Sequence, residues 1–152
     1  MLVPTKILVP TDFSGYSDKA LQQALDIAVE YKAKVYVVHV VHERIQRVLT
    51  DDYSDVTITP KEIQKYERTL VKTARSKLTK QIGKFPQRKE VEVVPEVVSG
   101  VPAEEILRVQ QERGIDLVVI ASLGRTGIAR YLIGGVARNV LKGAKCPVLL
   151  TK

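Results

Sequence analysis

The segment ASLGRTGIARYLIGG, residues 121–135, holds four of the nine glycines of the 152-residue chain. Gly124 and Gly127 can adopt positive φ angles without strain and let a ligand approach the backbone closely. Gly134 and Gly135 lie at the expected start of a helix, whose free N–H groups and dipole attract anions. The segment therefore suits phosphate binding. The alternative is a crossover loop whose glycines only form turns.

A second polar turn and two arginines add to this chemistry. Arg125 and Arg130 bring positive charge to the glycine-rich segment. The turn PTDFSGYS follows the first apolar run and places Asp12 beside Pro10 and Thr11. Asp12 is a candidate ligand contact, and the alternative is an aspartate that hydrogen-bonds its own turn or caps the following helix.

Other chemistries have weaker signals. Neither a P-loop ending in Lys-Ser/Thr nor a GxGxxG directly after the first strand is present, and no Ser/His/Asp or Cys/His arrangement is legible. The sequence therefore does not indicate strong catalysis. His39 and His42 are three residues apart on an expected strand and point to opposite faces, which disfavours a shared metal. We expect Cys146 to be a small buried hydrophobe at the start of a strand.

An alternation of strands and helices must position these residues. Five runs rich in Val, Ile and Leu are expected strands: 6–11, 34–41, 91–98, 115–121 and 147–151. Helical patterns are expected behind Ser14 and Ser17, from about Pro60 to Ile82, from near Pro102, and from about Gly134 to Lys142. Near-continuous apolar strands need burial on both sides, so this order predicts an α/β fold with helices on both faces of the sheet. In such sheets ligands bind beyond the carboxyl ends of the strands.

The composition predicts one soluble domain over residues 1–152. A hydrophobic content of 45% suffices for a single core. No apolar run approaches the roughly 18 residues of a membrane span, and the start of the chain lacks the pattern of a secretory leader. We therefore expect a cytoplasmic protein.

The net charge of +7 is concentrated in one segment. Residues 61–89 carry ten basic and two acidic residues, a charge of +8, which leaves −1 for the rest of the chain. Within this segment a basic stripe, spaced i, i+4, i+7, i+11 and i+14, lies roughly opposite the apolar stripe of the same helix: Lys61, Lys65, Arg68, Lys72 and Arg75. Such a stripe is more often a solvated face. As a nucleic-acid site it would contact phosphates only, since Tyr66 falls on the apolar side.

Over nearly its whole length the chain resembles the universal stress protein family. The resemblance is carried by KILVPTDFS and SDKAL near the start, HVV in the second expected strand, GVPAEEIL, and SLGRTGIARYLIGGVARNVLKGAKCPVLL near the end. It implies an open, twisted, five-stranded parallel sheet of order 3-2-1-4-5, of the adenine nucleotide alpha hydrolase-like type.

ATP-binding members of that family carry the motif Gly-x2-Gly-x9-Gly-Ser/Thr. Its spacing is intact here, with Ala121, Gly124, Gly134 and Gly135 at the four fixed positions. Ala121 replaces the first glycine, which adds a methyl group where the family's backbone approaches ribose and phosphate. Gly135 replaces Ser or Thr, which removes a hydroxyl donor but keeps the backbone N–H.

The resemblance further implies that Asp12 lies near the nucleoside and that the backbone of Val40 meets adenine, although Val40 has the alternative of a plain core position. The expected nucleotide-binding set is Pro10, Thr11, Asp12, Val40, Ala121, Ser122, Gly124, Arg125, Gly127, Gly134, Gly135 and Val136. The ligand is ATP, ADP or AMP, with or without Mg²⁺, and any ATP hydrolysis is slow.

We therefore expect a universal stress protein that acts as a stress-response or signalling switch. The alternatives are a nucleotide-free dimeric interaction protein and a basic nucleic-acid-binding stress protein. The resemblance also implies a homodimer, formed by antiparallel pairing of the last strand, Pro147 to Thr151, with its copy.

Overall fold

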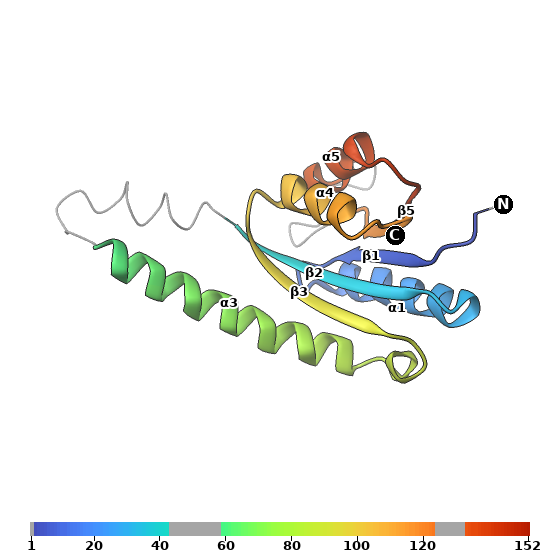
Figure 1. Cartoon of the computed structure of the whole chain (residues 1–152), viewed down its shortest axis with the longest axis horizontal. Helices are drawn as coiled ribbons and strands as arrows, with labels where there is room; N and C mark the ends of the chain where they lie inside the picture. The colour runs from blue at the N-terminus through green and yellow to red at the C-terminus, as the bar shows by residue number, and fades with distance from the viewer. Residues whose placement is uncertain (1, 43–58, 124–132) are drawn as a thin grey trace.

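The computed structural model describes residues 2–42, 59–123 and 133–152. Gly124, Arg125, Gly127 and Arg130 of the glycine-rich segment lie outside the described residues. The described chain forms one sheet with helices on both of its faces (Figure 1).

Five parallel strands make up the sheet: β1 (Lys6–Pro10), β2 (Lys34–His42), β3 (Val93–Gly100), β4 (Leu117–Ala121) and β5 (Val148–Thr151). Their order, β3-β2-β1-β4-β5, is the one that the family resemblance implied. The third strand lies two residues later than the sequence predicted, because its pairing with β2 continues until Gly100 lies opposite His42.

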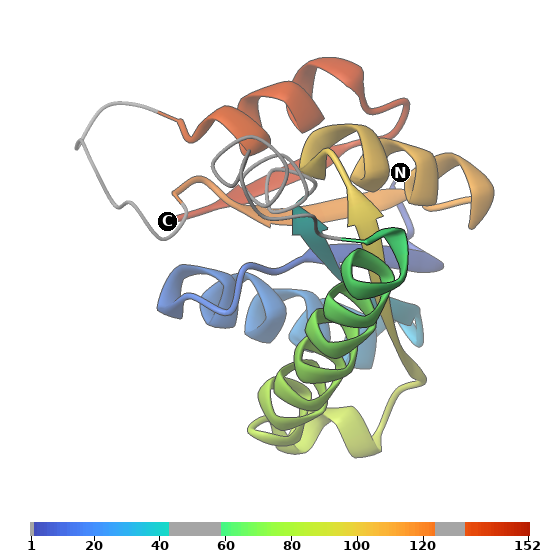
Figure 2. The same ribbon diagram turned by 90° about the vertical axis from the view of Figure 1, so that its left-hand side faces the viewer.

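The helices are α1 (Gly15–Tyr31), α3 (Pro60–Gly83), α4 (Pro102–Glu112) and α5 (Gly135–Gly143), with a short 3-10 helix, η1 (Pro86–Lys89), after α3. Helices α1 and α3 cover one face of the sheet, and α4 and α5 cover the other (Figure 2). None of the described helices combines the length and hydrophobicity needed to cross a bilayer.

Each face of the sheet carries its own hydrophobic core. In β1, Ile7 and Val9 point towards α1 and α3, while Leu8 points towards α4 and α5. All three side chains are fully buried. Alternating side chains of a strand face opposite sides, so burial on both sides explains why the strands read as continuous apolar runs.

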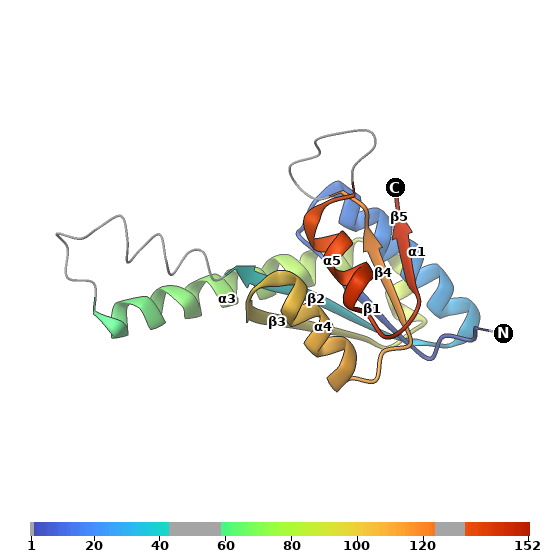
Figure 3. The same ribbon diagram turned by 90° about the horizontal axis from the view of Figure 1, so that it is seen from above.

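Helix α3 runs past the end of the sheet (Figures 1 and 3). Its buried residues all lie in its second half: Ala74, Leu78, Gln81 and Ile82. Tyr66, in the first half, was expected on the apolar side of the helix and therefore not exposed, but it is 43% exposed. The apolar periodicity is present, but the sheet is too short to cover it.

Candidate functional site

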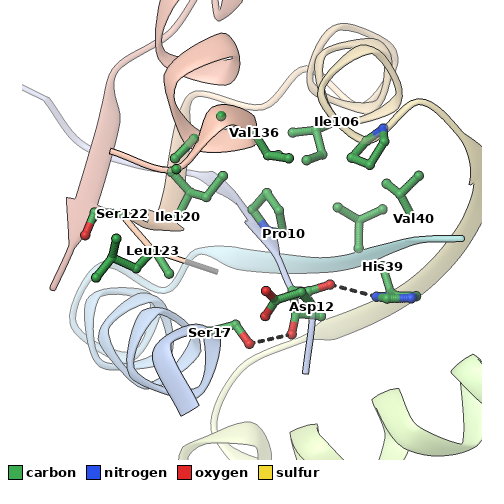
Figure 4. Close-up of a pocket in the computed structure, with 17 residues that line it drawn as sticks. Pro10, Asp12, Ser17, His39, Val40, Ile106, Ile120, Ser122, Leu123 and Val136 are labelled. Carbon is green, nitrogen blue, oxygen red and sulfur yellow. Dashed lines mark hydrogen bonds between the residues drawn. The ribbon is translucent and has the colours of Figure 1, made fainter. Parts of the chain in front are cut away.

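The described structure has a cavity of about 260 Å³ at the carboxyl edge of the sheet. It lies where the chain, having placed β2 and β3 on one side of β1, crosses over to place β4 on the other side. Such a switch in strand order leaves a crevice between the two crossovers, where open α/β sheets bind ligands. Figure 4 shows side chains from β1, β2, β4, α4 and α5 around this cavity.

The cavity brings together the described part of the expected nucleotide-binding set. These lining residues are Pro10, Thr11, Asp12, Val40, Ala121, Ser122, Gly134, Gly135 and Val136. The other three residues of that set, Gly124, Arg125 and Gly127, lie outside the described residues. Residues 110 positions or more apart in the chain therefore meet at one edge of the sheet, as ligand-binding residues of this fold class do.

Eight lining residues were not predicted: Ser17, Val38, His39, Pro102, Ile106, Ile120, Leu123 and Ala137. Several belong to the ends of β2 and β4, so their place at a carboxyl edge was the available signal. Pro102 and Ile106 come from the first turns of α4, and only the three-dimensional packing of this helix against β2 shows that they face the cavity.

The turn that carries Asp12 is held by its own hydrogen bonds. Asp12 Oδ1 accepts from the N–H of Ser14 at 2.9 Å, so the aspartate does stabilise its turn. Phe13 adopts a left-handed φ of 65°, and its N–H donates to Thr11 Oγ1 at 3.1 Å. The local role and a ligand role are compatible, because a carboxylate has two oxygens with several acceptor sites.

Beneath this turn lies a buried polar cluster of Thr11, Ser17 and Gln81, which are 6%, 2% and 3% exposed. Thr11 Oγ1 donates to Gln81 Oε1 at 2.8 Å and lies 2.9 Å from Ser17 Oγ. Gln81 Nε2 donates to Asp18 Oδ1 at 2.9 Å, so the cluster reaches the start of α1. Because buried polar groups need partners, this cluster fixes the turn to α1 and to α3.

His39 belongs to the wall of the cavity. Its Nδ1–H donates to the carbonyl of Thr11 at 2.8 Å, and its ring stacks on Phe13 with centroids 4.2 Å apart. His42 lies at the exposed end of β2. Within the described ranges, no group of three or more His, Cys, Asp or Glu is arranged to hold a metal ion. Through its hydrogen bond to Thr11 and its stacking on Phe13, His39 holds the Asp12 turn against β2.

The backbone of Val40 is directed at the cavity. Along β2, Lys34 N donates to Thr5 O and Val38 O accepts from Thr11 N, so even-numbered residues direct their N–H and C=O groups towards β1. The pairing with β1 ends at Pro10 opposite Val38. Val40 is the next even-numbered residue, and its peptide groups thus point to the space beyond the end of β1, where a planar base could pair with them.

The start of α5 closes the opposite side. The N–H of Gly134 donates to Ser122 O at 2.7 Å, which joins the two ends of the glycine-rich segment. Within the described part of the chain no side chain caps α5, and Gly135, Val136 and Ala137 of its first turn line the cavity. These N–H groups and the helix dipole form an anion-attracting end. A Cβ added at Gly135 would have no described atom within 4 Å, its chain neighbours and the backbone of its own helix apart.

Cys146 lies outside this site and packs as a small hydrophobe close to the start of a strand, as expected, but it is less buried than predicted. It is half-buried and precedes β5, packing against the core under α4 and α5. Burial, assisted by the negative charge of Asp116, raises the pKa of its thiol. The thiol is thus less reactive than a free one at neutral pH.

The fold and site define a class: three-layer α/β proteins with a crevice at the carboxyl edge of a five-stranded parallel sheet. The chain belongs to the universal stress protein family, whose sequence model matches residues 4–152. The universal stress protein MJ0531 of Methanocaldococcus jannaschii is 35% identical over 148 residues, covering 97% of this chain and 81% of that protein. The universal stress protein YxiE of Bacillus subtilis is 31% identical over 147 residues, covering 97% of this chain and 98% of that protein.

Solved structures show the same fold. That of MJ0577 from Methanocaldococcus jannaschii superposes with a TM-score of 0.81 at 26% identity, covering 99% of this chain and 97% of the other. A universal stress protein of Archaeoglobus fulgidus in complex with dAMP superposes with a TM-score of 0.63 at 22% identity, covering 99% of this chain and 100% of the other. A universal stress protein in complex with cAMP superposes with a TM-score of 0.61 at 21% identity, covering 99% of this chain and 98% of the other.

Proposed function

We propose that this protein binds an adenine nucleotide in the cavity at the carboxyl edge and acts as a nucleotide-dependent switch in stress response or signalling. The observation that carries the proposal is the pair of opposed backbone features at the cavity. The β2 backbone at Val40 offers a donor and an acceptor on one side, and the uncapped start of α5 offers anion-binding N–H groups on the other. Two neighbours of the same fold hold adenine nucleotides, which supports this ligand class.

The chemistry of the walls fits such a ligand from base to phosphate. Pro10, Ile106 and Ile120 give apolar surface for the base, next to the Val40 backbone. Asp12 supplies a carboxylate that accepts from an amino or hydroxyl group of the nucleoside. Phosphates lie at the first turn of α5, and Mg²⁺ bound to ATP accompanies them without a dedicated protein site.

A binding role fits this cavity better than catalysis. Among its described lining residues, Asp12 is the single acidic side chain, and its Oδ1 accepts from the N–H of Ser14. General acid and base chemistry on a phosphate needs a second positioned group, and the other titratable lining residue, His39, is held by its bond to the Thr11 carbonyl and by stacking on Phe13. We infer slow ATP hydrolysis at most, so that occupancy rather than turnover carries the signal.

Two substitutions relative to the family motif test this assignment. Gly135→Ser adds a hydroxyl at an open position at the start of α5 and should tighten ATP binding by about 1 kcal/mol, roughly fivefold. Ala121→Gly removes the methyl group at the end of β4 and should tighten it less. Calorimetric titration of wild type, both single variants and the pair measures this; no binding by any of the four would contradict the proposal.

We further propose a homodimer through β5, Val148–Thr151. This strand is an edge of the sheet and pairs with β4 alone within the described sheet. Leu149 and Leu150 are half-buried, and an apolar edge strand needs cover. Sedimentation should show a dimer at micromolar concentration that Leu149→Lys dissociates; a monomer unaffected by the substitution would count against it.

A further inference from the structure

The basic stripe of α3, residues Lys61, Lys65, Arg68, Lys72 and Arg75, is not used by the nucleotide site. All five side chains are exposed, and the stripe faces away from the sheet. With one residue every 1.5 Å, it forms a row about 21 Å long with roughly one cation per helical turn. The first half of α3 projects past the sheet (Figure 3), and the five side chains of the row are exposed to solvent.

The stripe differs from an ordinary solvated helix face in its charge pattern. Each neighbouring pair along it, such as Lys61 with Lys65 and Arg68 with Lys72, places like charges at i,i+3 or i,i+4, an arrangement that weakens a helix. Helix α4 of the same chain does the opposite. There Arg108 pairs with Glu105 at 2.6 Å and with Glu112 at 2.7 Å.

Neutralising partners for the stripe are lacking among the described side chains. The ion pairs among the described residues involve cations outside the stripe, including Lys34, Lys84 and Arg113. The acidic residues of α3 lie off the stripe. Glu62 turns back to the start of the helix, where it accepts from Thr59 N at 2.8 Å. Glu67 is half-buried and, two helical turns before Ala74, lies on the same side of the helix as the buried residues.

We propose that the basic stripe of α3 is a docking surface for the phosphate backbone of double-stranded nucleic acid. A single polyanionic partner carries enough negative charges to offset the repulsion between the cations of the stripe. One strand of a duplex carries a phosphate every 3.4 Å, so the row covers about six base pairs. Contacts to phosphates position a protein without reading bases, so binding is indifferent to sequence.

Other partners fit this surface less well. A helix that lies on a membrane inserts its apolar face, but Ala74, Leu78 and Ile82 of α3 are buried against the sheet. An acidic protein partner would need apolar anchors at the centre of the contact. The exposed aromatic of α3, Tyr66, lies about 100° around the helix from Lys65 and outside the row.

The test compares two variants of equal net charge. Lys65→Gln, Arg68→Gln and Lys72→Gln together remove the three central charges of the stripe, and Lys19→Gln, Lys142→Gln and Lys152→Gln together remove three exposed lysines elsewhere. Fluorescence anisotropy follows binding of duplex DNA and duplex RNA of about 20 base pairs, each in two unrelated sequences, over a range of salt concentrations. Vesicles of anionic lipid form a separate arm.

We expect the stripe variant to lose at least tenfold in affinity for the duplex and the control variant to stay within about twofold. The slope of log affinity against log salt should fall by about 2.7 in the stripe variant, from 0.9 per lost phosphate contact. Its melting temperature should equal or exceed that of wild type, because repulsion is removed. If it folds poorly, the single variants Lys65→Gln and Arg68→Gln should each reduce the slope by about 0.9.

Three results would overturn the proposal: equal weakening by both triple variants, no binding of any duplex at low salt, or stripe-dependent binding to vesicles but not to duplexes. The proposal is independent of the nucleotide site, so ATP affinity should be the same in wild type and both triple variants.

Discussion

Thr11 Oγ1, in the turn that carries Asp12, lies 2.8 Å from Oε1 of Gln81, seventy residues further along the chain. Through this contact the C-terminal half of α3 holds a turn at the edge of the cavity. His39 holds the same turn from β2 by its bond to the Thr11 carbonyl. The position of Asp12 therefore depends on two elements that are distant from it in sequence.

Replacing Gln81 should loosen this arrangement. Gln81→Leu leaves the buried hydroxyls of Thr11 and Ser17 with fewer partners, and we expect a loss of about 1 to 3 kcal/mol in the free energy of unfolding. Gln22→Leu, on the exposed face of α1, should change it by less than about 0.5 kcal/mol. Urea denaturation of both variants measures this, and equal stabilities would show that the buried cluster contributes little.

The two roles of Asp12 can be separated by two substitutions. Asn keeps an oxygen that accepts from Ser14 N but removes the charge, so Asp12→Asn should leave stability unchanged within about 0.5 kcal/mol and weaken ATP binding roughly fivefold. Asp12→Ala loses both roles and should also lower stability. Calorimetry and thermal melting provide the two readouts. ATP affinity equal to wild type in both variants would confine Asp12 to its turn.

The Val40 backbone can be tested without touching the pairing of β2 with β3. That pairing uses the N–H groups of odd-numbered residues of β2, as Val35 N donating to Glu92 O shows. Val40→Pro removes an N–H directed at the cavity and should weaken ATP binding between about twofold and tenfold. Val40→Ala keeps that N–H and serves as the matched control. If both variants bind alike, the N–H of Val40 does not contact the base.

Cys146 gives a prediction about pH. Its thiol pKa is raised above the ordinary value of 9.0, so the folded protein holds the proton more tightly than the unfolded chain does. This tighter hold on the thiol proton contributes to the free energy of unfolding. The contribution is fully present below the ordinary thiol pKa and is lost as pH rises through the pKa of the folded protein. Between about pH 8 and about pH 10, wild type should lose more unfolding free energy than Cys146→Ala. Equal losses in urea denaturation would contradict this.

The sequence predicted the strands well because their Val, Ile and Leu runs serve both faces of one sheet. Strand order was implied by the family resemblance, since local patterns do not specify which strands pair. The lag of two residues in β3 arises from its register with β2, which pairs Gly100 with His42. Such register depends on contacts between distant segments.

Chain connectivity predicted that the turn after β1 and the segment after β4 meet at one edge of the sheet, and the family resemblance added Val40 to the candidate site. Asp12 and Val40 lie at or after strand ends, and carboxyl ends of parallel strands share one edge. Gln81 gave no signal, because a glutamine in a helix is ordinarily a surface residue and only packing places this one beneath Thr11. The exposure of Tyr66 was missed for the converse reason: periodicity shows a face but not how far the sheet beneath it extends.

The most direct test of the account is the location of bound nucleotide in solution. Amide resonances of the isotopically labelled protein should be followed during titration with ATP, with GTP as a control for the base. We predict saturable shifts at Thr11, Asp12, Val40, Ser122 and Val136, smaller with GTP, and little change along the exposed face of α3. Absence of shifts at millimolar ATP, or shifts confined to Lys61 through Arg75, would contradict the assignment of the cavity as a nucleotide site.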